Sequence, residues 1–152
     1  GDLDGQWQLI HTWDRQNKRY LKDVGIEPAA FYGFGIITRF CAKNSDVVKT
    51  TKTGSPKILS QTIKSPTGKL TTYILNLADE TENIEYEIVG KYEEPLYLYK
   101  ASEAEVAQPD YRMEGQKILL PETGILNIQI PPRSIYTLSQ YKLRHKDPGV
   151  KR

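Results

Sequence analysis

The acidic residues come first, because paired carboxylates are the commonest machinery for hydrolytic chemistry. Such a pair needs two carboxyl groups about 5 Å apart, one with a raised pKa as the acid and one ionised as the nucleophile. The candidates are Glu80, Glu82, Glu93 and Glu94, all in segments that read as turns beside lysine or proline. Water around a turn keeps a carboxyl pKa ordinary, and adjacent glutamates on a strand point apart. The sequence therefore predicts no catalytic residues in this chain.

Other chemistry-bearing residues are few. The two histidines, His11 and His145, are too few for most histidine metal sites. Cys41 is the only cysteine, which excludes an intrachain disulfide and a cysteine metal cluster, and its place on an apolar row predicts an inert core thiol. Gly33-Phe34-Gly35 lacks the third glycine of a dinucleotide fingerprint. We expect no cofactor and no metal.

Aromatic side chains are the remaining candidates for binding. Trp7, His11 and Trp13 share one face of a predicted strand, and Tyr97 and Tyr99 share one face of another. Exposed rings at these positions could stack on sugars, whereas buried rings would belong to the core. Sequence alone leaves both interpretations open for Trp7, Trp13, Tyr97 and Tyr99.

Composition and charge narrow the class of protein. The chain has 152 residues, 38% of them hydrophobic, with ten tyrosines against three phenylalanines, which fits a thin fold rich in strands. The net charge of +2 is spread along the chain except for a basic C-terminus from Lys142, which we expect to be a disordered tail. Basic and aromatic residues do not interleave as a nucleic-acid platform requires, and no apolar run is long enough to span a bilayer. We therefore expect neither a nucleic-acid partner nor a membrane span.

The first 45 residues read as an extended segment followed by a helix. Gln6–Trp13 has a strand pattern, and 14–22 is a polar, basic turn. Pro28 suits the first position of a helix, because its missing N–H costs nothing there. Two apolar rows then recur at helical spacing, which predicts a helix covered on more than one side: Ala30, Phe34, Ile37 and Cys41; and Tyr32, Ile36 and Phe40. Gly33 and Gly35 suit such a helix only where another backbone packs closely, so a strand over Phe31–Phe40 stays the alternative.

Residues 46–141 read as short strands separated by turns. The clearest hairpin joins Ile58–Lys64 to Leu70–Leu77 through Ser65-Pro66-Thr67-Gly68. Leu126–Ile130 alternates apolar and polar residues, Pro131-Pro132 interrupts it, and Ser134–Leu138 resumes. The stretch 101–113 is irregular and predicts a long surface loop. This pattern predicts an antiparallel β-sandwich of about seven to nine strands, with the N-terminal helix packed on one sheet.

Three segments together resemble part of a glycoside hydrolase. Trp7–Trp13 with Pro28–Phe40 is similar to the last strand and final helix of a catalytic (β/α)8 barrel. Leu59–Leu77, with Asn76 near its end, is similar to a hairpin of the β-sandwich that follows such barrels. Leu120-Pro121 through Ile135 is similar to the closing strands of that sandwich.

This resemblance implies a non-catalytic C-terminal accessory sandwich that supports an upstream catalytic barrel of the same polypeptide. It also implies a secreted, periplasmic or cell-surface parent enzyme whose catalytic residues lie upstream of Gly1. Two alternatives stay open: a carbohydrate-binding module that uses the rings named above, with a polysaccharide as partner, and a surface adhesion or assembly sandwich.

Overall fold

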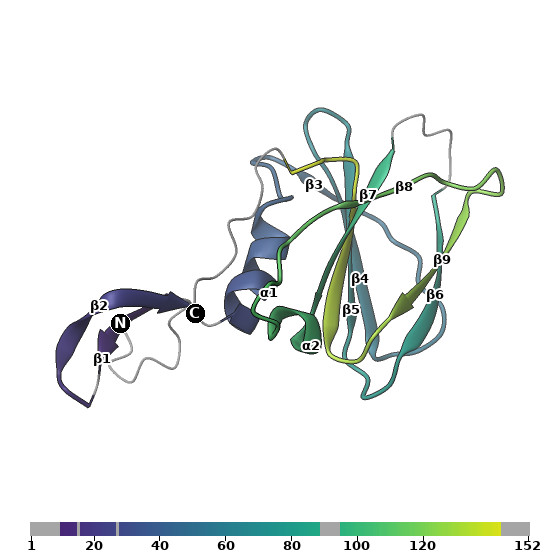
Figure 1. Ribbon diagram of the computed structural model, residues 1–152. Helices are drawn as coiled ribbons and strands as arrows, with labels where there is room; N and C mark the ends of the chain where they lie inside the picture. The colour runs from purple at the N-terminus through teal and green to yellow at the C-terminus, as the bar shows by residue number, and fades with distance from the viewer. Residues whose placement is uncertain (1–9, 15, 27, 89–94, 144–152) are drawn as a thin grey trace.

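The protein is described by a computed structural model that covers residues 10–14, 16–26, 28–88 and 95–143. Within these ranges the chain is mainly β-structure, and every strand pair is antiparallel. Strands β3 to β10 form two facing sheets, and the main helix lies on the outer side of the larger sheet (Figure 1). The predicted antiparallel β-sandwich with an N-terminal helix on one sheet is confirmed.

The larger sheet has six strands, and their order is not the order in the chain. Across the sheet they are β3 (Asp46–Val48), β4 (Ile58–Lys64), β5 (Leu70–Asn76), β10 (Ser134–Ser139), β7 (Leu96–Ser102) and β8 (Gln116–Ile118). The smaller sheet pairs β6 (Glu82–Glu87) with β9 (Ile125–Ile130). The last strand of the sequence, β10, is thus central, and all its residues are buried.

Each face of the larger sheet carries its own apolar core. The core toward the β6–β9 sheet contains Ile58, Ile74, Leu98, Ile128, Ile130, Tyr136 and Leu138. The core toward the helix contains Tyr32, Ile36, Phe40, Ile63, Tyr73, Tyr99, Ala101, Val106, Met113 and Ile135. The molecule therefore has three layers, with the six-stranded sheet in the middle.

Helix α1 (Pro28–Thr38) begins at the proline that the sequence singled out, so helix rather than strand is confirmed. The reason expected for its glycines is wrong. A Cβ on Gly33 would meet nothing within 4 Å, and one on Gly35 would meet only the Nε of Arg39, at 3.8 Å. No backbone of another segment therefore packs closely against either glycine.

Two turns lie where their residues predicted them. Gly68 closes the β4–β5 hairpin with φ of +84°, and its N–H donates to the Ser65 carbonyl at 2.8 Å. The Pro131-Pro132-Arg133 turn does more than interrupt a ladder, because β9 belongs to the smaller sheet and β10 to the larger one. Arg133 adopts φ of +49° where the chain crosses between the sheets.

Two segments differ from expectation. Residues 14–22 are not a turn throughout, since β1 (Ile10–Asp14) and β2 (Arg19–Ile26) pair as a hairpin that stands apart from the sandwich (Figure 1). The expected surface loop at 101–113 holds the end of β7 and helix α2 (Glu103–Val106). Ser102 and Glu105 form a capping box there, and this S-x-x-E spacing was the overlooked signal.

Candidate functional site

The inner apolar row of α1 fixes the helix to the sheet. Tyr32, Ile36 and Phe40 are only 1%, 0% and 3% exposed. The Phe40 ring packs on Tyr99 with centroids 4.4 Å apart, and Tyr32 meets Tyr111 edge-on at 4.6 Å. These contacts place α1 over the face of the larger sheet and determine which of its sides is left open.

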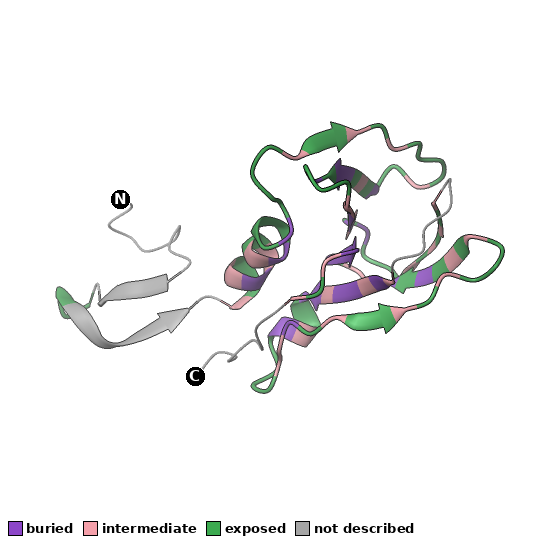
Figure 2. Ribbon diagram, turned by 90° about the horizontal axis from the view of Figure 1, so that it is seen from above, coloured by how far each residue is buried: buried purple, intermediate pink, exposed green. Residues whose placement is uncertain are grey.

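The outer row of α1 is open to solvent. We call Ala30, Phe34 and Ile37 of α1, together with Cys41 three residues beyond the end of the helix, the outer face of α1; all four are exposed, Phe34 at 58% and Ile37 at 41% (Figure 2). The expectation that the helix is covered on more than one side is wrong for this chain, and so is the expectation of a buried Cys41. Paired large apolar side chains on one exposed helix face are typical of a contact surface.

A mainly apolar pocket of about 430 Å³ borders this face. Ala29 and Gly33 contribute from α1, Leu75 and Leu77 from the end of β5, and Val106 from α2. Gly33 is one helical turn from both Ala30 and Ile37, so the pocket and the outer face of α1 are neighbours. Leu77 is itself 55% exposed, which extends the apolar surface from the helix onto the sheet edge.

The end of α1 is tied to the sheet by a tyrosine. The Tyr73 hydroxyl donates to the Ile37 carbonyl at 2.9 Å in the last turn of the helix, and the Phe40 N–H donates to the same carbonyl at 3.4 Å. Burial, reinforced by the nearby Cys41 thiol, raises the pKa of Tyr73 well above its ordinary value. Tyr73 therefore keeps its proton and holds the helix end in place under ordinary conditions.

Of the proposed sugar-stacking residues, the structure describes the side chains of Tyr97 and Tyr99. Tyr99 is 0% exposed; its hydroxyl donates to the Tyr141 carbonyl at 3.1 Å and accepts from the Leu143 N–H at 2.9 Å. Tyr97 is half-buried and packs against the same core. Trp13 lies in β1, where the backbone alone is described, and Trp7 lies outside the described residues. Tyr99 thus follows the alternative of core packing, and sugar binding by the tryptophans stays a prediction.

The structure describes only two of the four candidate glutamates. Glu80 is exposed and Glu82 half-buried around the start of β6, whereas Glu93, Glu94 and His145 fall outside the described residues. Within the described ranges, no three His, Cys, Asp or Glu side chains come together as a metal site would require. The described helices are all too short or too polar to cross a bilayer.

Comparisons with known proteins bear on the fold. No protein-family model and no curated protein sequence matches this chain. Among solved structures, the catalytic domain of a family 30 xylanase from Talaromyces cellulolyticus matches with a TM-score of 0.60 and 17% identity, over 77% of this chain and 25% of that one. A family 30 endoxylanase from Clostridium papyrosolvens matches with a TM-score of 0.56 and 16% identity, over 71% and 26%.

A family 30 subfamily 8 xylanase from Clostridium acetobutylicum matches with a TM-score of 0.58 and 11% identity, over 84% of this chain and 30% of that one. The present chain therefore spans only about a quarter to a third of the enzymes it is similar to. At these identities the likeness is one of fold. The chain has the fold of a β-sandwich portion of glycoside hydrolase family 30 enzymes, which is the class that its sequence resembles.

Proposed function

We propose that this chain is a non-catalytic accessory β-sandwich that supports the catalytic barrel of a longer glycoside hydrolase polypeptide. The observation that carries the proposal is the outer face of α1, a helix that is apolar on both sides and covered by the sandwich on only one. We propose further that the parent enzyme works outside the cytoplasm on a polysaccharide.

The free energy available from covering the outer face of α1 suits a contact within one polypeptide. Full burial of a large apolar side chain stabilises by about 1.5 to 3 kcal/mol. Phe34 and Ile37 still expose 58% and 41% of their surface. Covering what remains exposed would therefore contribute roughly 1.5 to 3 kcal/mol. That is too little to hold two free molecules together, but it is useful between parts of one polypeptide.

The proportions of the solved enzymes favour a catalytic barrel as the occupant of this face. This chain corresponds to 25%, 26% and 30% of the three xylanase chains, so most of each lies outside the matched part. A (β/α)8 barrel of about 250 residues has the right size for that remainder. Helix α1 also precedes the sandwich strands in the sequence, so it is the helix nearest to the point where an upstream barrel would connect.

The first experiment tests for the missing chemistry. The isolated chain is incubated with a panel of chromogenic glycosides and with soluble xylan. We expect no turnover that depends on the protein. Turnover that a single carboxylate substitution abolishes would overturn the non-catalytic assignment.

The second experiment tests whether the outer face of α1 stabilises the catalytic part of the longer polypeptide. Phe34→Asp with Ile37→Asp is introduced both into the isolated chain and into the polypeptide that carries it. Because both side chains lie on the outer face of α1, the isolated variant should keep its unfolding midpoint. In the longer polypeptide the catalytic part should lose activity at a lower temperature than in the unsubstituted enzyme. An unchanged inactivation temperature, or a polypeptide without a barrel on the N-terminal side, would contradict the proposal.

A further inference from the structure

The inner face of the larger sheet, which points toward the smaller sheet, changes from apolar to polar side chains along β4 and β5. Ile58 and Ile74 belong to the apolar core that faces the smaller sheet. The next positions on the same face carry hydroxyls instead: Ser60, Thr62 and Thr72. Strand residues facing a partner sheet are ordinarily apolar, so this half of the face is not built as sandwich core.

We call Ser60, Thr62 and Thr72 the floor. Hydrogen-bonded hydroxyls connect this floor to the smaller sheet. The Thr62 and Thr72 side-chain oxygens lie 2.9 Å apart, and Thr72 Oγ1 lies 2.9 Å from the Tyr86 hydroxyl of β6. Thr62 and Thr72 are 9% and 1% exposed, while Tyr86 is half-buried. The hydrogen bond holds Tyr86 beside the floor, and Tyr86 stays half-buried while it packs against the apolar core on this side of the sheet.

Here the two sheets diverge around a groove of about 1170 Å³. One wall is β6, which pairs with β9 alone among the described strands. The other wall is the 49–55 segment, which connects β3 to β4. Lys52 fixes this wall, since its Nζ donates to the carbonyls of Ser55 and Ile58 at 2.6 and 2.7 Å. The groove is therefore bounded by structure on three sides.

The charges along the groove cancel. Its charged residues are three lysines and three glutamates: Lys49, Lys52, Lys64, Glu82, Glu85 and Glu87. A polyanion or a strongly basic peptide would meet as much repulsion as attraction there. Serine, threonine and asparagine side chains supply further donors and acceptors in both directions. A neutral ligand that carries many hydroxyls fits this lining best.

We propose that the groove between β4, β6 and the 49–55 segment binds an uncharged oligosaccharide. The half-buried Tyr86 lies beside a sugar ring in the groove, and the half-buried Ser60 together with the exposed Thr51 and Thr53 of the 49–55 segment bind the sugar hydroxyls. This site is separate from the outer face of α1 and does not depend on a catalytic barrel.

The test uses the isolated chain with xylohexaose and cellohexaose as probes, followed by backbone amide shifts in NMR. Saturable shifts should cluster on β6, on the 49–55 segment and on the inner face of β4. Ser60→Phe places a ring inside the groove and should weaken binding by at least about tenfold. Leu59→Phe is the matched control, because it places the same ring one residue away on the opposite, 49% exposed side of β4.

Three further arms make the test decisive. Thr53→Trp, at an exposed position in the groove wall, replaces Ser60→Phe if that variant does not fold. An oligogalacturonate of matched length should bind at least about tenfold more weakly than the neutral sugars, since the groove carries no net charge. An extended peptide should not bind. The proposal is overturned if neither neutral sugar shifts these amides, if Leu59→Phe weakens binding as much as the groove variants, or if only the peptide or the polyanion binds.

Discussion

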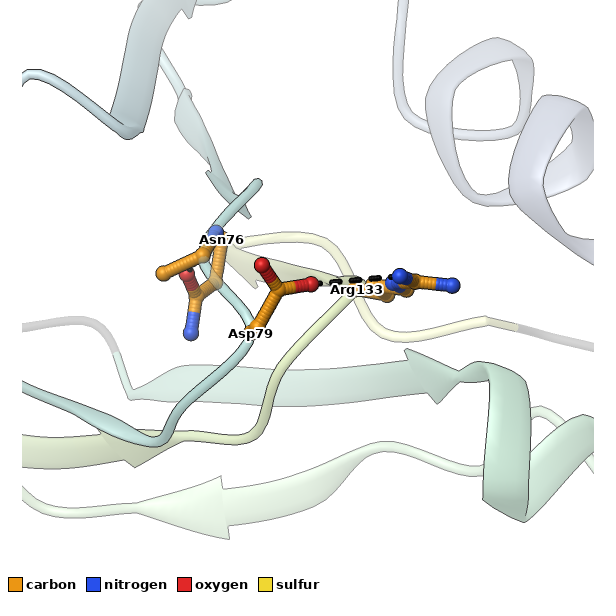
Figure 3. A network of polar contacts seen from close by, with 4 residues as sticks. Asn76, Asp79 and Arg133 are labelled. Atoms are coloured by element: carbon orange, nitrogen blue, oxygen red, sulfur yellow. Dashed lines mark hydrogen bonds and ion pairs between the residues drawn. The ribbon is translucent and has the colours of Figure 1, made fainter.

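Replacing Asn76 by alanine should destabilise the sandwich more than any single surface change. Asn76 ends β5, is 0% exposed and reaches two other segments (Figure 3). Its Nδ2 donates to the carbonyls of Glu80, Ile130 and Pro131 at 2.8, 2.9 and 3.0 Å, and its Oδ1 accepts from the Ala78 N–H at 2.8 Å. The side chain thus joins the larger sheet to the end of β9 and to the turn before β6.

The magnitude follows from which of these groups water can reach. The bonds with the Ile130 carbonyl and the Ala78 N–H are buried, whereas the other two are only partly buried. A buried polar group left without a partner costs about 1 to 3 kcal/mol. Two such groups lower the free energy of unfolding by about 4 kcal/mol, while water replaces the other two bonds. With a slope of about 2 kcal/mol per M, the urea midpoint should fall by about 2 M.

The control is Asp79→Ala in the same turn. Asp79 forms an ion pair with Arg133 at 3.1 Å, with the two side chains 76% and 68% exposed (Figure 3). Exposed ion pairs contribute about 0 to 1 kcal/mol, so its midpoint should move by no more than about 0.5 M. Equal midpoint changes for the two variants would refute the reasoning, because they would mean that Asn76 contributes no more than an exposed pair.

Further predictions concern two glycines and a buried tyrosine. Gly115→Ala would place a Cβ 2.5 Å from the Tyr99 ring and should lower stability by about 1 to 3 kcal/mol. An added Cβ at the half-buried Gly33 meets nothing within 4 Å, so Gly33→Ala in α1 should raise stability by about 1 kcal/mol, and urea midpoints that move in the same direction for the two variants would contradict one of these predictions. Burial, reinforced by the negative charge of Glu105, raises the pKa of Tyr136 to about 12 from 10.0. The native state therefore holds a proton that the unfolded chain releases, and stability should fall as the pH rises from about 10 to about 12. Urea midpoints across that window should fall less steeply in Tyr136→Phe, and an identical slope would show that another group is responsible.

The features that sequence predicted correctly are those set by neighbouring residues. Pro28 marks the start of α1, the Ser-Pro-Thr-Gly turn closes the β4–β5 hairpin, and Pro131-Pro132 ends β9. Each needs only the backbone preferences of a few consecutive residues. Helix α2 was also within reach, because its capping box is a local pattern.

The candidate sites could not be predicted in the same way, because they depend on contacts between distant segments. Both rows of α1 are apolar, so the sequence does not say that Phe34 remains exposed while Phe40 is covered by Tyr99. The groove depends on the contact between Thr72 and Tyr86, which lie on strands of different sheets. Nothing in the sequence says that the inner face of β6 borders a groove.

Cys41 offers the most direct test of the outer face of α1 as a covered surface. It is the only cysteine of this chain and is exposed at the end of that face. The rate at which a maleimide labels Cys41 is measured by peptide mass spectrometry in the isolated chain and in the polypeptide that carries it. The account predicts rapid labelling in the isolated chain and at least about tenfold slower labelling in the longer polypeptide, where a barrel covers the helix. Equal rates in the two proteins would contradict it.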